Sequence, residues 1–185
     1  MRSLTTLCTP HRGCAAIQEF MRRPDIHPTF YNMEKAFEVL GMNFKNAEEF
    51  SHANISAFNE VATDSPDVDY YSFGAKKKEL QMTELLRPGY QIITNHEILH
   101  ECDGMNRVED MKWARYLLTF DHDHFDIVGF NPRINPRHIA NIVTDNIRLS
   151  EAKSEGVEFE PFGLPATEIQ ELTEKARVPI EIKKL

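Results

Sequence analysis

The chain has 185 residues, 41% of them hydrophobic and 27% charged, and this length and balance are typical of one globular domain. Its net charge of −8 argues against non-specific binding to nucleic acid and against an anionic membrane surface, so we expect neither partner. No apolar run approaches the ~20 residues of a transmembrane segment, and the N-terminus lacks the apolar region of a secretory signal peptide.

The first third of the chain predicts one strand followed by helices. Leu4–Cys8 is rich in β-forming residues and predicts a buried strand that ends at a proline-containing loop. Ala15–Arg22 predicts a short helix. Tyr31–Leu40 has apolar residues at helical spacing and is followed by a glycine, which suits a helix end. Asn46–Val61 predicts one or two further helices.

The middle of the chain contains the strongest strand signal. Val68–Ala75 combines β-branched and aromatic residues and ends near a glycine, which predicts a strand. Lys76–Leu86 is ambiguous and we expect it to be exposed, whereas Tyr90–Glu101 is a possible helix. Lys112–Phe120 is an apolar run that leads into a histidine-containing loop. Pro136–Leu149 has its apolar residues on one face and predicts an amphipathic helix.

After Ser150 the composition changes to an acidic and then basic segment that contains three prolines. We therefore divide the chain into a domain over residues 1–149 and a divergent tail over 150–185, which we expect to be peripheral or partly ordered. Within the tail, Thr167–Arg177 could form a helix with Thr167 as its N-cap.

The three cysteines, Cys8, Cys14 and Cys102, are an odd number without the spacing of a disulfide framework. Reduced thiols fit an intracellular compartment, cytoplasmic or mitochondrial. Cys14 follows a Pro-His-Arg-Gly loop rather than a sharp strand-to-helix turn. We therefore expect it to be a buried or half-buried side chain and not a nucleophile.

Two motifs suggest part of a catalytic triad. Asp103 is followed by a glycine on a loop, and His124 comes 21 residues later, followed by Phe125 and Asp126. An acid followed by a histidine matches the order of these groups in α/β-hydrolases, where they follow the nucleophilic serine. None of the 8 glycines, however, has a serine two positions on, so the chain has no Gly-x-Ser-x-Gly motif. The alternatives are a simple Asp-Gly turn and a solvated acidic loop around the histidine.

A different motif competes with this interpretation. His96-Glu97-Ile98-Leu99-His100 has the H-E-x-x-H pattern, which on a helix places two histidines on one face as zinc ligands. A third ligand could be Glu109 or Asp110. The pattern is short and occurs by chance, so a pair of surface histidines is the simpler alternative.

Taken together, these residues resemble the triacylglycerol-lipase-like α/β-hydrolases of fungi and other eukaryotes, which are distantly akin to bacterial lipases. Four stretches carry the resemblance, which extends over residues 2–149: RSLTTLCTPHRG at 2–13, the region 31–75, the Asp103 loop to Trp113, and the histidine loop at 120–128. The resemblance implies that Asp103 is the catalytic acid and that His124, rather than His122, is the catalytic base.

The resemblance also implies an α/β fold that is the C-terminal part of an α/β-hydrolase. We expect its outer parallel strands with flanking and lid helices, while the N-terminal strands, the oxyanion loop and the nucleophile elbow are missing. The sequence departs from the family at Cys102, where asparagine is usual, at Asn106-Arg107, and at Cys14, where serine is usual.

The leading expectation for function is a lipase or carboxylesterase, represented by a portion that supplies the acid and the base but no nucleophile. Its substrate would be a lipid or another acyl ester, no cofactor would be needed, and a missing N-terminal half or a partner chain would complete the site. The alternative is a truncated hydrolase, inactive by itself, that serves as an interaction module through an exposed sheet edge.

Overall fold

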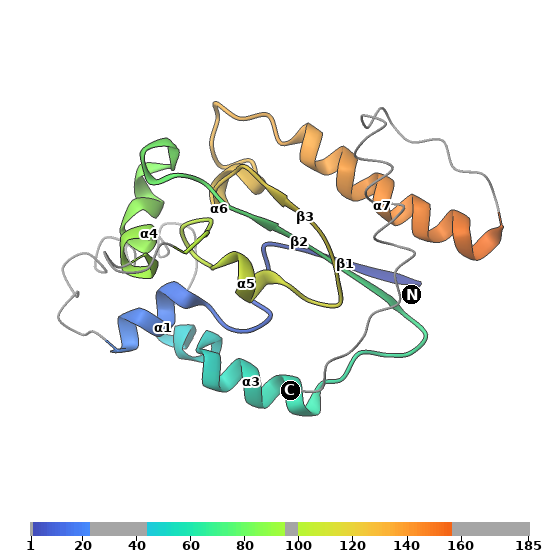
Figure 1. Ribbon diagram of the computed structural model, residues 1–185, viewed down its shortest axis with the longest axis horizontal. Coiled ribbons are helices and arrows are strands. Elements are labelled where there is room, and N and C mark those ends of the chain that lie inside the picture. The colour runs from blue at the N-terminus through green and yellow to red at the C-terminus, as the bar shows by residue number, and fades with distance from the viewer. Residues whose placement is uncertain (1, 23–43, 95–99, 157–185) are drawn as a thin grey trace.

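The computed structural model describes residues 2–22, 44–94 and 100–156, and Figure 1 shows their arrangement. Three strands form a parallel sheet in the order β1-β2-β3, with β1 at Ser3–Leu7, β2 at Asp69–Ala75 and β3 at Arg115–Phe120. The sheet and its helices are compatible with an α/β fold. That the fold is part of an α/β-hydrolase stays a prediction.

Helices cover both sides of this sheet. In Figure 1 the long helix α7 lies on one side of the strands, and α1, α3 and α5 lie on the other. The helical elements of the described residues are α1 (Ala15–Arg22), η2 (Phe44–Phe50), α3 (His52–Val61), η3 (Glu79–Gln81), η4 (Glu84–Leu86), α4 (Arg87–Ile93), α5 (Val108–Met111), α6 (His124–Ile127) and α7 (Arg137–Glu155). No helix among them is long and apolar enough to cross a bilayer.

Two clusters of buried apolar side chains hold these layers together. The first joins the sheet to α7 and includes Phe73, Leu117 and Ile142. The second joins α1 to α4 and to the loop after residue 100, and includes Ala16 and Met105. Because apolar burial is the dominant stabilising term in folding, the second cluster fixes the position of that loop on the body of the domain.

Most elements expected from the sequence are present, with small shifts at their ends. The strands predicted at Leu4–Cys8 and Val68–Ala75 and the helices predicted at Ala15–Arg22 and Pro136–Leu149 are confirmed. Asn46–Val61 forms η2 and α3 as expected. The helices predicted at residues 31–40 and 167–177 lie outside the described residues.

Two expectations were confirmed only in part. Lys76–Leu86 was expected to be exposed, but Met82 and Leu86 are only 2% and 3% exposed, because two short 3-10 turns direct them into the second cluster. The helix expected at Tyr90–Glu101 begins earlier and ends at Ile93, and residues 100–101 are not helical.

The helix α7 continues past the expected start of the tail. It ends at Glu155, where Gly156 takes a left-handed conformation with φ of +68°, as is common at helix ends. The proposed boundary at residues 149 and 150 therefore falls within this helix, and the division into domain and tail stays a prediction.

Parallel pairing brings the C-terminal ends of the three strands to one edge of the sheet. Binding and catalytic groups in α/β folds are placed at this edge, on the loops that follow the strands. The loops after β1, β2 and β3 begin at Cys8, Lys76 and Asp121, respectively, and the histidine loop is the last of these.

Candidate active site

The histidine and aspartate singled out in the sequence lie on two loops that are joined to each other. His124 is the first residue of α6, four residues after β3 ends. Asp103 lies in a tight loop in which its own N–H donates to the carbonyl oxygen of Asn106 at 3.1 Å. The N–H of His124 in turn donates to the carbonyl oxygen of Asp103 at 3.0 Å. This backbone contact sets the two side chains at a fixed separation.

The side chains meet in a short hydrogen bond. The Nδ1 atom of His124 lies 2.7 Å from Oδ2 of Asp103. The other carboxylate oxygen accepts from the backbone N–H groups of Met105 at 2.9 Å and Asn106 at 2.8 Å. The Asp103 side chain is fully buried, whereas that of His124 is 30% exposed. The carboxylate is therefore held from both sides in the interior, while part of the ring faces outward.

The electrostatics of this pair favour the charged form of the ring. Burial lowers the pKa of His124, but the charge of Asp103 and its hydrogen bond outweigh burial, and Asp123 adds to their effect. The net result is a pKa raised above the ordinary value of 6.5. A carboxylate that stabilises an imidazolium in this way performs the task of the acid in a Ser-His-Asp triad.

The ring is free to exchange a proton on its far side. Among the described residues, no hydrogen bond to Nε2 of His124 is found. When Nδ1–H donates to the carboxylate, Nε2 carries the lone pair and can accept a proton from another group. The arrangement can thus act as a general base oriented by an acid.

The neighbouring histidine of the same loop does not take part. His122 packs with its ring edge against Phe120, at a centroid distance of 6.4 Å and an angle of 85°. The structure brings His124, and not His122, to Asp103. The catalytic roles that the resemblance implied for Asp103 and His124 stay a prediction.

Two polar residues, Asn106 and Arg107, hold the Asp103 loop. The amide Nδ2 of Asn106 donates to the carbonyl oxygen of Cys8 at 3.3 Å, which ties the loop to the end of β1. Arg107 makes a bidentate contact with Asp110, at 2.7 and 3.0 Å, and the hydrogen bond to this carboxylate raises the pKa of the guanidinium. These two polar residues therefore stabilise the part of the loop that follows the acid.

The thiols near the site are not suited to act as nucleophiles. Burial, followed by the charge of Asp103, raises the pKa of Cys8 well above its ordinary value. Burial also raises the pKa of Cys14 to about 12, and its thiol donates to the carbonyl oxygen of Met105. Because the thiolate is the reactive form, neither group is activated. The expectation that Cys14 is a buried side chain is confirmed.

Sequence reasoning missed three further charged residues around His124. Asp123 and Asp126 were considered part of a solvated acidic loop, but both side chains are fully buried and both contact the ammonium group of Lys77. The two aspartates form a reciprocal cap at the start of α6. The spacing Asp-x-x-Asp ahead of an apolar residue is a variant of the capping-box pattern and could have indicated this turn.

The zinc hypothesis is not supported within the part of the chain that the structure describes. Those residues contain no group of three or more histidine, cysteine, aspartate or glutamate side chains that could hold a metal ion. His96 and Glu97 lie outside the described residues, so the H-E-x-x-H interpretation stays a prediction.

Comparison with known proteins adds an independent observation. Most of the chain is similar to a lipase. Over 133 residues, or 71% of its length, it is 26% identical to triacylglycerol lipase 2 of Saccharomyces cerevisiae. These residues cover 39% of the yeast lipase, so the chain spans about two-fifths of that relative. No protein-family model matches the chain.

Proposed function

We propose that this chain supplies the acid and the base of a serine hydrolase that cleaves carboxylic esters of lipids. The observation that carries the proposal is the 2.7 Å contact between Nδ1 of His124 and the fully buried carboxylate of Asp103. In this role Asp103 is the acid and His124 is the base. The similarity to a triacylglycerol lipase supports a lipid ester as the substrate class.

The chemistry of the pair follows from its geometry. Nε2 of His124 would remove the proton of a serine hydroxyl while the serine oxygen attacks the ester carbonyl. The imidazolium then donates that proton to the departing alcohol, which leaves an acyl-serine. A water molecule then attacks the acyl-serine with the same help from His124, and the carboxylic acid product is released. Throughout, Asp103 holds Nδ1–H and stabilises the charged ring.

The nucleophile in this proposal lies outside the 185 residues. None of the glycines of the chain forms a Gly-x-Ser-x-Gly motif with a serine. We infer that the serine and the donors of the oxyanion hole come from preceding polypeptide in a longer protein or from a partner chain. Removing one such donor costs about 3 kcal/mol of transition-state stabilisation in serine hydrolases, so the chain alone is expected to be inactive toward esters.

The test uses the protein isolated from its source, in its natural length and with any bound partner. A fluorophosphonate probe, which reacts with activated serines, is expected to label a serine outside residues 1–185. In matched preparations, His124→Ala should reduce ester hydrolysis by about 10⁴-fold or more, measured with a soluble acyl ester and with a triacylglycerol emulsion. The control is His122→Ala, because His122 lies on the same loop and does not contact Asp103.

Two outcomes would contradict the proposal, and a special case of the first would also favour the alternative hypothesis. The probe could label no serine in the isolated protein or its partners. Labelling could be equal in the His124→Ala and His122→Ala variants, which would show that His124 does not activate the serine. Alternatively, the protein could be recovered with a stable partner but without probe-reactive serine, and this result would favour the interaction-module hypothesis.

A further inference from the structure

The loop that presents His124 contains an unusual concentration of buried charge. Asp123 and Asp126 flank the histidine and are fully buried, and both face the ammonium group of Lys77, whose side chain is 12% exposed. Removing charges from water is costly, and a buried ion pair often contributes little to stability. Stability is therefore a weak explanation for two carboxylates and one lysine at this place.

Every oxygen of the two carboxylates is hydrogen-bonded. The first oxygen of Asp123 accepts from the N–H groups of Phe125 and Asp126, at 3.0 and 2.9 Å, and the second accepts from the N–H and hydroxyl of Thr83, at 2.8 and 2.9 Å. In Asp126, Oδ1 accepts from Asn131 at 2.7 Å, and Oδ2 accepts from Lys77. Such a set of donors selects one conformation of the turn.

The contact between Lys77 and Asp126 favours the charged form of both groups. Burial raises the pKa of Asp126, but hydrogen bonds from Lys77 and Asn131 outweigh burial and bring the pKa below its ordinary value. Burial lowers the pKa of Lys77, and the contacts with Asp126 and Asp123 outweigh this effect and raise the pKa. The lysine thus maintains the Asp126 carboxylate as a hydrogen-bond acceptor.

Lys77 also reaches the other half of the site. It lies two residues after β2, the central strand of the sheet. Its backbone N–H donates to the carbonyl oxygen of Cys102 at 3.0 Å, immediately before Asp103. One residue therefore binds the loop of the acid through its backbone and the loop of the base through its side chain.

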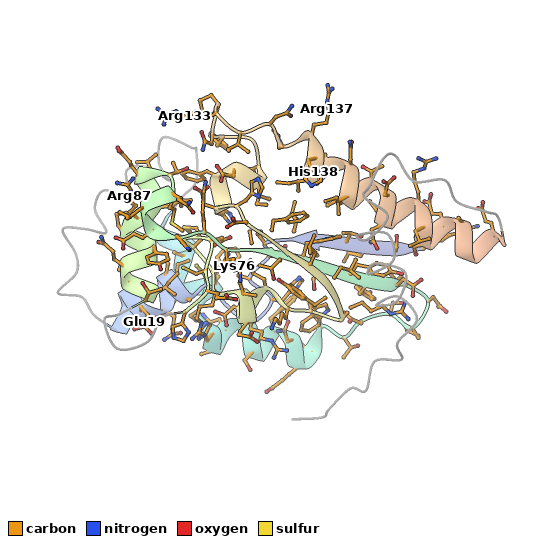
Figure 2. All side chains as sticks on the ribbon, turned by 45° about the horizontal axis from the view of Figure 1, so that its top comes forward. Glu19, Lys76, Arg87, Arg133, Arg137 and His138 are labelled. Carbon is orange, nitrogen blue, oxygen red and sulfur yellow. The ribbon has the colours of Figure 1, made fainter. Side chains whose placement is uncertain are left out.

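The adjacent lysine provides an internal comparison. Lys76, labelled near the centre of Figure 2, forms its ion pair with Glu101 at 2.5 Å, and both side chains are largely exposed. Exposed ion pairs of this kind contribute little to stability. Lys76 and Lys77 thus share a segment and a charge but differ in burial and in what they contact.

We propose that Lys77 is a positioning residue for the Asp103–His124 pair. Through its contacts with Asp123 and Asp126, it fixes the first turn of α6 and so aligns the imidazole with the carboxylate. Its catalytic significance rests on the proposed function, while its structural effect on the ring does not. The prediction concerns the alignment of the imidazole, which can be measured in the 185-residue chain without substrate.

The experiment compares Lys77→Met with Lys76→Met, using nuclear magnetic resonance of the imidazole nitrogens. In the parent chain and in Lys76→Met, the Nδ1–H proton of His124 should give a low-field signal that exchanges slowly with water. In Lys77→Met that signal should be lost, and the pKa of His124 should fall because the ring no longer meets Asp103. Lys77→Arg, which retains the charge, should restore the signal.

The direction of the pKa change separates positioning from a simple loss of charge. If the ring stays in place, removing a nearby positive charge raises the pKa of His124, and the low-field signal persists. A raised or unchanged pKa with a persistent signal in Lys77→Met would overturn the proposal. Failure of the esterase test would leave this result intact, so the two proposals can fail separately.

A milder variant covers the case in which Lys77→Met does not fold. Thr83→Val removes one hydroxyl donor to Asp123 and leaves the ion pair and the backbone donor in place. We expect a weakened low-field signal and a smaller fall in the pKa of His124. An unchanged signal and pKa in a folded Thr83→Val chain would count against the proposal.

Discussion

Two histidines in this molecule make side-chain hydrogen bonds of nearly equal length, but their pKa values are shifted in opposite directions. Nδ1 of His124 lies 2.7 Å from a carboxylate oxygen of Asp103, and Nε2 of His11 lies 2.8 Å from the hydroxyl of Thr6. The pKa of His124 is raised, whereas burial, opposed only in part by Asp64, lowers the pKa of His11.

The difference lies in the partners. Thr6 offers a neutral hydroxyl, which does not compensate the cost of burying a charged ring. His11 also stacks on Trp113, at a centroid distance of 5.3 Å, which fits a structural role for a neutral ring at the end of β1. A short histidine contact is therefore poor evidence for acid–base chemistry unless the partner is a buried, ionised acid that is itself held by donors.

The largest expected effect comes from making the partner of His124 neutral, like that of His11. Asp103→Asn should lower ester hydrolysis by about 10⁴-fold in the nucleophile-containing protein, because the ring loses its orientation and the imidazolium its counter-charge. In the chain itself the pKa of His124 should fall, measured by nuclear magnetic resonance.

The control for this variant is Asp64→Asn, which changes the acid near His11. It should lower the pKa of His11 further and leave that of His124 unchanged. A pKa of His124 that stays high in Asp103→Asn would show that Asp103 does not determine the electrostatics of the ring.

A smaller effect is expected from the loop that presents the acid. Gly104 has φ of +94°, and a Cβ there would lie 2.8 Å from Cβ of Leu86 and 2.9 Å from the sulfur of Met82. Gly104→Ala should lower the free energy of unfolding by about 3 kcal/mol, from backbone strain and overpacking together. Gly156→Ala meets no atom within 4 Å and should cost only about 1 kcal/mol.

Urea denaturation of both glycine variants measures this difference. Equal losses of stability would show that the space around Gly104 does not constrain the loop. A destabilised but folded Gly104→Ala chain that keeps the His124–Asp103 signal would show that the loop tolerates more movement than its packing indicates.

The smallest expected effect is on the pH dependence of stability, and its sign should differ between the two histidines. A raised pKa in the folded state means that His124 contributes stability below pH 6.5, which is lost as the pH rises through the folded pKa. A lowered pKa means that His11 contributes stability above pH 6.5, which is lost as the pH falls.

Denaturation of His124→Gln and His11→Gln across pH 5 to 9 tests these signs. Relative to the parent chain, His124→Gln should be most destabilised at low pH and His11→Gln at high pH. The same pH trend in both variants would contradict the assignment of opposite shifts.

The sequence predicted the parts of the fold that depend on local pattern. Val68–Ala75 was recognisable as a strand from its β-branched and aromatic residues, and α7 from its apolar face. The burial of Met82 and Leu86 was not recognisable, because Met82 follows one short 3-10 turn and Leu86 ends the next. These turns have no periodicity, and the burial of the two residues depends on contacts with distant helices. Burial of such turns is a tertiary effect.

The candidate site divides in the same way. Asp103 and His124 could be selected from motif order and resemblance, and the structure brings them together. The pairing of Lys77 with Asp123 and Asp126 could not be predicted. Lys77 is 46 and 49 residues away from them in the sequence, and no local signal relates it to them. A buried charge becomes recognisable only when its partner is known.

The three buried cysteines have a practical consequence. Cys8 belongs to the cluster between the sheet and α7, whereas Cys14 and Cys102 belong to the cluster beneath the Asp103 loop. Their raised pKa values leave little thiolate in the folded chain, so alkylation requires that the surrounding structure open. The rate at which each thiol is alkylated therefore reports how often its own half of the interior becomes accessible, without any engineered cysteine.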